Sequence, residues 1–256
     1  MFRNFKEMED YLLSNGIKKT IALANAQDDV ALEALVHAKK TGIVDAILIG
    51  DTKKIESLLE AMNENKNDYT IIECDDEREA ANLACNLIKE GRADIPMKGL
   101  MQTSNFMKAI LNKELGFFKE GSLLSQATLL QFKEENRFLI ISDCAVNISP
   151  DLSAKGKITA NAIKLAHSLG IEKPNIAFLS AVEKVNPKIV STVDAKELAD
   201  LANAGAFGEI GYAAGPLALD NAISEEAAKH KGIESPVCGH ADILIVPDLC
   251  SGNIFT

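Results

Sequence analysis

Short apolar runs alternate along the chain with longer segments in which apolar residues recur every three or four positions. The short runs are typical of buried strands and the longer segments of amphipathic helices, so the alternation predicts an α/β fold with mainly parallel sheet. Two expected helices have the clearest period. Their apolar stripes consist of Ala80, Leu83, Ala84, Leu87 and Ile88, and of Ile158, Ala162, Leu165, Ala166 and Leu169. The expected strands are 20–24, 45–49, 69–74, 94–97, 138–142, 175–179 and 242–246.

Residues that favour helix ends flank the expected helices. Glycines follow several helical stretches, and Asp194 with Glu197 resembles an N-terminal capping pair. The rhythm breaks near residues 120–135, in GSLLSQATLLQF, which predicts an odd strand or a crossover. We therefore expect a first α/β domain over 1–128 and a second over 129–256.

Composition and charge narrow the functional classes. The 256 residues include 37 acidic and 27 basic side chains, and this net charge of −10 argues against nucleic acid as a partner. The five cysteines show no metal-binding or disulfide spacing, and the histidines form no metal-binding pair, so we expect reduced thiols and no metal site. No apolar run approaches the ~20 residues that span a bilayer, and the first residues lack a signal-peptide pattern. These features predict a cytoplasmic protein that has no membrane contact.

Candidate chemistry is expected where the strands end, because ligands of open α/β sheets bind beyond the carboxyl ends of the strands. Lys98 and Thr103 follow the strand 94–97, where a lysine beside a glycine suits an anion, although a surface lysine at a tight turn would look the same. Asp143 follows the strand 138–142. It could accept a thiol proton or hold an amide, or it could serve as a helix cap or turn former.

Later strand exits carry hydroxyls, acids and an amide. Ser180, Glu183, Ser191 and Thr192 follow the strand 175–179 and suit either a small oxyanion site or plain loop capping. Asp220 lies near the start of an expected helix that Gly232 ends, and Gly215-Pro216 is expected to fix the turn before it. Asn253 follows the last strand, at another helix entry that could bind an anion.

Several generic motifs are absent. Lys155-Gly156-Lys157 resembles the end of a P-loop, but Asp151 stands where that motif needs a glycine. Three glycines near residue 208 have the wrong spacing for a dinucleotide-binding loop, and no GxSxG elbow indicates a serine hydrolase.

Five strings together resemble one known family. ISDCAVNISPDL, NAIKLAHSLGI, LSAVEKVNPKIVSTVDA, GPLALDNAISEEAAKHKGIESPV and ADILIVPDLCSGNI occur in the order typical of the phosphate acetyl/butyryltransferase family, and are most similar to its butyryl branch. MKGLMQTSNFM resembles the family's Lys-Gly motif. The similarity is close over residues 94–256 and architectural before them.

The resemblance implies reversible transfer of a short acyl group between coenzyme A and inorganic phosphate. It also implies two three-layer α/β/α domains flanking a cleft, similar to isocitrate and isopropylmalate dehydrogenases, and a homodimer or larger assembly. Coenzyme A is then a substrate, and no bound cofactor is expected. Lys98 would hold an anion, and Ser180, Ser191 and Thr192 would donate to phosphate or acyl oxygen.

Relatives continue to a Ser-Arg motif that has no counterpart before Thr256, so the catalytic residues stay unassigned. The alternatives are a truncated remnant of the family that binds coenzyme A or pairs with an intact subunit, and a dehydrogenase of similar fold. The length of the acyl chain stays open, since one methylene contributes only ~1–3 kcal/mol of discrimination.

Overall fold

The computed structural model describes residues 1–132 and 135–255, which pack as two units. The first unit is Met8–Glu120, and the second is Met1–Glu7 with Gly121–Thr256. The division lies before the expected boundary at 128/129, which falls inside strand β5 (Ala127–Phe132), the strand that pairs with β6 (Arg137–Ser142). The first residues join the second unit because the Phe2 amide donates to the Leu169 carbonyl and the Phe5 ring packs edge-on against Phe138.

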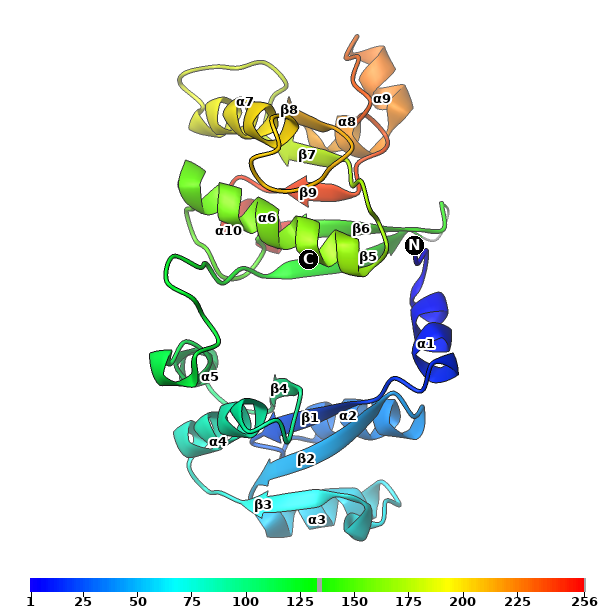
Figure 1. Cartoon of the computed structure of the whole chain (residues 1–256), viewed down its shortest axis with the longest axis vertical. Coiled ribbons are helices and arrows are strands. Elements are labelled where there is room, and N and C mark those ends of the chain that lie inside the picture. Colours follow the sequence, from blue (N-terminus) through cyan, green and yellow to red (C-terminus); the bar gives the residue numbers. More distant parts are fainter. Residues whose placement is uncertain (133–134, 256) are drawn as a thin grey trace. The chain divides into compact units, whose positions relative to one another are not determined.

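The first unit is built on four parallel strands in the order β3-β2-β1-β4 (Figure 1). They are β1 (Lys19–Ala24), β2 (Val44–Gly50), β3 (Thr70–Glu73) and β4 (Ile95–Lys98). Its helices are α2 (Asp29–Lys40), α3 (Thr52–Ala61), α4 (Glu77–Lys89) and α5 (Thr103–Ile110), with short 3₁₀ turns at Lys66–Asp68 and Lys113–Leu115. Helix α1 (Phe5–Ser14) spans the division between the units.

Helices cover both faces of this sheet. Ala22 and Ala24 pack in one cluster with the buried face of α4, whereas Leu23 between them packs with the buried faces of α2 and α3. Because both faces are buried, the strand reads as an unbroken apolar run. This is why the alternation of apolar runs predicted the α/β class.

In the second unit the described residues form a sheet of five strands in the order β5-β6-β9-β7-β8. Besides β5 and β6, they are β7 (Ile176–Leu179), β8 (Ala213–Leu217) and β9 (Ile243–Ile245). Among the strand pairs that the structure describes in this unit, β5–β6 alone is antiparallel, as an odd strand in GSLLSQATLLQF would be. The helices are α6 (Leu152–Ser168), α7 (Val190–Asn203), α8 (Leu219–Ile223), α9 (Glu225–His230) and α10 (Leu249–Phe255).

Two local expectations in this unit are wrong. Gly215-Pro216 was expected to form a turn but lies inside β8, an edge strand, where a proline that lacks an N–H group is tolerated. The helix expected between Asp220 and Gly232 is two helices, because the chain is extended at Ser224. The Ser224 hydroxyl accepts from the Ala227 amide at 3.2 Å and so begins α9.

No helix within the described ranges is both long and apolar enough to cross a membrane.

Candidate functional site

The carboxyl ends of the parallel strands of the second unit open onto one edge of its sheet, which we call the carboxyl edge. Strand β6 leads into Asp143, β7 into Ser180 and β8 toward Asp220, while α10, which carries Asn253, follows β9. The structure thus gathers most of the expected site residues on one edge of one sheet. Lys98 and Thr103 belong to the first unit, at the carboxyl end of β4.

Two serine hydroxyls meet at this edge. Ser180 directly follows β7, its amide donates to the Leu217 carbonyl at 2.9 Å, and the residue is 8% exposed. Its Oγ lies 2.8 Å from the Oγ of Ser191 in the first turn of α7. Each hydroxyl carries one proton, so the pair uses one internally and has one left to donate to another oxygen.

Thr192 has a structural role instead. It is fully buried, and its Oγ1 donates to the Ile189 carbonyl at 2.7 Å and accepts from the Asn186 amide at 2.8 Å. Its hydroxyl therefore stabilises the loop that leads into α7, in agreement with the loop-capping alternative of the sequence analysis. The structure does not place this hydroxyl where it could donate to a substrate.

Glu183 and Asp220 are joined through one lysine. Glu183 Oε1 accepts from Lys231 Nζ and from Asn221 Nδ2, both at 2.7 Å, and Lys231 Nζ lies 3.0 Å from Asp220 Oδ2. The hydrogen bond from Lys231 is the main reason why the pKa of Glu183 is lowered, with smaller contributions from its backbone amide and Asn221. Glu183 is thus a paired carboxylate at neutral pH, which suits positioning better than proton transfer.

A groove lies beside this network. Its volume is about 790 Å³, and its lining combines Val182, Val185 and Ile233 with Glu183 and Lys231. An apolar wall with a few charged groups is typical of small-molecule sites.

Asp143 forms a turn. Its side chain is 2% exposed, and Oδ1 accepts from the amides of Ala145 and Val146 at 2.9 and 3.0 Å. Oδ2 accepts from the amide and the side chain of Asn147. With four donors from its own loop, this carboxylate matches the turn-former alternative, and the structure does not place it as an acceptor for a thiol.

Helix α10 packs closely on the Asp143 loop. A Cβ at Gly252 would lie 2.8 Å from the Asp143 carbonyl oxygen, so only glycine fits without a shift. The exposed Asn253 side chain reaches the Cys144 carbonyl at 3.4 Å. Asn253 therefore borders the same loop at the carboxyl edge.

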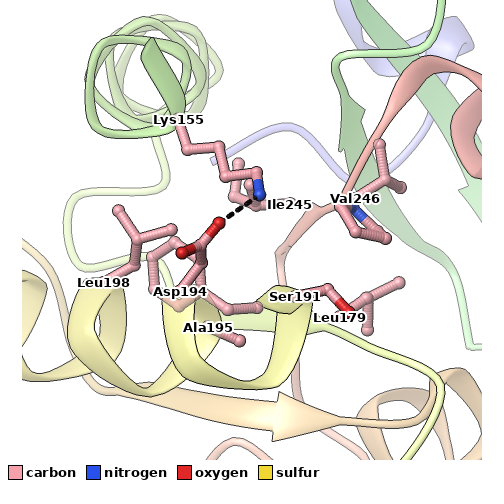
Figure 2. A pocket seen from close by; sticks show the side chains of 10 residues that line it. Lys155, Leu179, Ser191, Asp194, Ala195, Leu198, Ile245 and Val246 are labelled. Carbon is pink, nitrogen blue, oxygen red and sulfur yellow. Dashed lines mark hydrogen bonds and ion pairs between the residues drawn. The ribbon is translucent and has the colours of Figure 1, made fainter. Parts of the chain in front are cut away.

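Lys155 and Asp194 form a buried ion pair that the sequence analysis missed. Lys155 Nζ lies 2.7 Å from Asp194 Oδ2. Figure 2 shows the Lys155 side chain reaching from α6 toward Asp194 on α7. Asp194 lies one turn after Ser191 on that helix. Asp194 was expected to cap a helix, but α7 begins at Val190 and Asp194 lies inside it. Lys155 falls three positions before Ile158 on the apolar stripe of α6, and a lysine on a buried stripe is a signal for a buried charge pair.

In the first unit, Lys98 borders a tight loop. Its Nζ donates to the carbonyls of Gly99 and Met101 at 3.3 and 3.2 Å. Thr103 is exposed at the start of α5, and the preceding Gln102 makes no side-chain capping hydrogen bond. At this helix start the Glu77 carboxylate already accepts from the Gln102 amide at 3.3 Å and from the Asn105 side chain at 3.1 Å, so the ammonium group, not the helix start, is what suits an anion.

Asn25, which the sequence analysis did not single out, supports this loop. Asn25 directly follows β1 with a φ of 57°, and its Nδ2 donates to the Leu100 carbonyl at 2.8 Å. Its Oδ1 is buried and has no hydrogen-bond partner among the residues that the structure describes. A Cβ at Gly99 would lie 2.2 Å from the Asn25 carbonyl oxygen, which explains the glycine after Lys98. An asparagine at a strand exit, where left-handed backbone is tolerated, is the signal that could have identified it.

Among the residues that the structure describes, no group of three or more His, Cys, Asp or Glu side chains is arranged to hold a metal ion.

Comparisons with known proteins agree on one family. The sequence profile of the phosphate acetyl/butaryl transferases matches residues 76–256. The chain is 41% identical to the phosphate butyryltransferase of Clostridium acetobutylicum over 254 residues, which are 99% of this chain and 83% of that protein. It is 36% identical to the phosphate acetyltransferase of Thermotoga maritima over 242 residues, 94% of this chain and 81% of that one.

A solved structure leads to the same family. The crystal structure of a branched-chain phosphotransacylase from Enterococcus faecalis superposes with a TM-score of 0.78 at 33% identity, covering 93% of this chain and 82% of that one. The matches favour the transferase over the dehydrogenase alternative. By profile, sequence and fold, the chain belongs to the phosphate acetyl/butaryl transferase family.

Proposed function

We propose that the protein transfers a short acyl group between coenzyme A and inorganic phosphate, in the butyryl case converting butyryl-CoA and phosphate to butyryl phosphate and coenzyme A. The observation that carries this proposal is the 41% identity to a phosphate butyryltransferase over 99% of the chain. The paired hydroxyls and the lysine at the strand exits supply groups that such a reaction needs.

In the forward reaction a phosphate oxygen attacks the thioester carbonyl. A tetrahedral oxyanion forms, and it collapses as the carbon–sulfur bond breaks and the thiolate leaves. Donors aimed at the developing oxyanion lower this barrier. We assign the outward proton of the Ser180–Ser191 pair to that oxygen or to a phosphate oxygen, and Lys98 to an anionic group of a substrate.

The family resemblance implies direct attack, without an acyl-cysteine intermediate. Burial raises the pKa of the Cys85 and Cys238 thiols, which keeps them in the poorly nucleophilic protonated form. Cys144 is buried as well.

The proposal extends to the location, assembly, fold and acyl group of the protein. We propose a cytoplasmic homodimer or larger homo-oligomer whose fold resembles isocitrate and isopropylmalate dehydrogenases, with coenzyme A as substrate and no bound cofactor. The reduced-cysteine pattern and the acidic composition support the location, and the family resemblance supports the rest. Among acyl groups we propose butyryl, with acetyl, propionyl and branched chains as competitors.

The test is a thiol-release assay with butyryl-CoA and phosphate. We expect phosphate-dependent release of coenzyme A, and S180A and S191A variants with kcat lowered about 100-fold. The matched control is S168A, because Ser168 is an exposed serine whose hydroxyl only donates to the Leu165 carbonyl at the end of α6. Stabilisation by butyryl-CoA without turnover would favour the binding-remnant alternative, and equal rates for S180A and S168A would remove the serines from the mechanism.

A further inference from the structure

Lys155 is an unusually buried cation. Its residue is 6% exposed, and Asp194 Oδ2 at 2.7 Å is its hydrogen-bond acceptor among the described residues. An ammonium group has three protons to donate. Because a charge removed from water is costly unless its donors are satisfied, the remaining protons need further acceptors.

A small cavity lies against this ammonium group. Its volume is about 10 Å³, roughly the space that one water molecule needs. Its polar lining is Lys155, Ser191 and Asp194, and the rest is apolar, including Phe178 and Leu198. Figure 2 shows Lys155, Ser191, Asp194 and Leu198 around the cavity. A buried water needs two to four polar partners, and this lining offers three.

We propose that one ordered water in this cavity connects Lys155 to the serine pair, which makes Lys155 a positioning residue. This inference rests on the proposed function, because it concerns the hydroxyls assigned to the substrate oxygen. The ammonium group can only donate, so the water accepts from Lys155 Nζ. The water then donates one proton to the Asp194 carboxylate and the other to Ser191 Oγ.

The direction of these hydrogen bonds determines which of the two serine hydroxyls donates to the other. Ser191 Oγ, which accepts from the water, donates its own proton to Ser180 Oγ at 2.8 Å. Ser180 is then left with its proton free to point at a substrate oxygen. Polarised hydrogen bonds in a buried chain strengthen one another, so the charge of Lys155 makes Ser180 a better donor to a developing oxyanion.

The kinetic test uses a variant without either charge. K155M alone would leave the Asp194 carboxylate half-buried without its partner, so we use K155M/D194N, in which both side chains are neutral and close to the original size. We expect kcat for butyryl-CoA and phosphate to fall about ten-fold while both KM values stay within about two-fold, since the effect acts on the oxyanion. Adding S191A to this variant should lower kcat no further than S191A alone.

The matched control is K157M, because Lys157 lies on the same helix and is exposed. Its kcat should equal that of the wild type. A purely structural ion pair would change the melting temperature of K155M/D194N without lowering kcat, and that result would overturn the inference.

A crystal structure of the whole chain at about 1.5 Å tests the water independently of activity. We expect a water within hydrogen-bond distance of Lys155 Nζ and Ser191 Oγ in the wild type, and its loss in K155M/D194N. A wild-type structure without that water overturns the relay even if the enzyme is active. A wild type without phosphate-dependent thiol release overturns the proposed function instead, so the two failures are distinguishable.

Discussion

Removal of the Asp143 carboxylate should destabilise the second unit strongly, because the carboxylate organises the turn after β6. It accepts four hydrogen bonds from its own loop, three of them from backbone amides. In D143A these donors lose their acceptor inside a segment where the wild-type side chain is 2% exposed. In D143N one carboxylate oxygen is replaced by an NH₂ group, which cannot accept the hydrogen bonds that the loop's donors make to that oxygen in the wild type.

The magnitude follows from the number and type of these bonds. A hydrogen bond to a charged group contributes about 1.5–3 kcal/mol, but the four are not additive because some amides can turn toward water. We therefore expect D143A to lower the free energy of unfolding by about 4 kcal/mol and D143N by about 2 kcal/mol. The matched control is D151A, because Asp151 caps α6 through one 2.7 Å hydrogen bond from the Ala154 amide, and loss of such a cap costs about 1 kcal/mol.

Urea denaturation followed by circular dichroism measures these differences. With a slope of about 2 kcal/mol per molar urea, D143A should move the midpoint by about 2 M and D151A by about 0.5 M. If D143A and D151A had equal midpoints, the turn would not depend on this carboxylate. If D143N kept full stability but lost turnover, Asp143 would act in the chemistry, and our structural assignment would be refuted.

Three further predictions concern stability in the second unit. G252A places a Cβ 2.8 Å from the Asp143 carbonyl oxygen and should cost about 1–3 kcal/mol in urea denaturation. The hydrogen bond from Lys231 lowers the pKa of Glu183 below 4.5, so the pair stabilises the fold above pH 4.5, and this contribution is lost as the pH falls through the folded pKa. Urea denaturation should therefore show the stability of E183Q approaching that of the wild type as the pH falls from 7 to 3. Burial raises the pKa of Asp242 above 3.8, so its contribution is present below 3.8 and lost as the pH rises through the folded pKa. D242N should therefore become more stable relative to wild type as the pH rises from 3 to 7, the opposite trend to E183Q.

The α/β class was predictable because doubly covered strands need unbroken apolar runs. Strand β1 shows this, since its residues face opposite helix layers and all had to be apolar at its centre. Strand β8 was missed because AAGPL has neither a run of β-branched residues nor an alternation. A proline is allowed there only because the strand lies at an edge, which is a property of the assembled sheet and not of the local sequence.

The location of the candidate site was easier to predict than the roles of its residues. The ends of parallel strands share an edge, so strand prediction alone brings Asp143 and Ser180 to one side of the sheet, whereas Asp220 follows β8, the strand that was missed. Whether a polar side chain there faces a substrate or its own loop depends on the path of a few backbone amides. Asp143 and Thr192 satisfy their own loops, and no spacing in the sequence distinguishes them from Ser180.

The role of a buried charged residue is easier to predict from the sequence than that of a polar residue at a strand end, because a charged residue on an apolar helix face stands out. Lys155 lies about one turn before Ile158, on the face of α6 that is apolar from Ile158 to Leu169, and a fold keeps a lysine there only if a partner compensates its charge. Asp194 is that partner, from a helix almost forty positions later in the chain. A hydrophobic pair would hold α6 against α7 at lower cost, so the presence of the charges argues for a role beyond packing. Their position beside Ser191 points to the serine pair as the group on which they act.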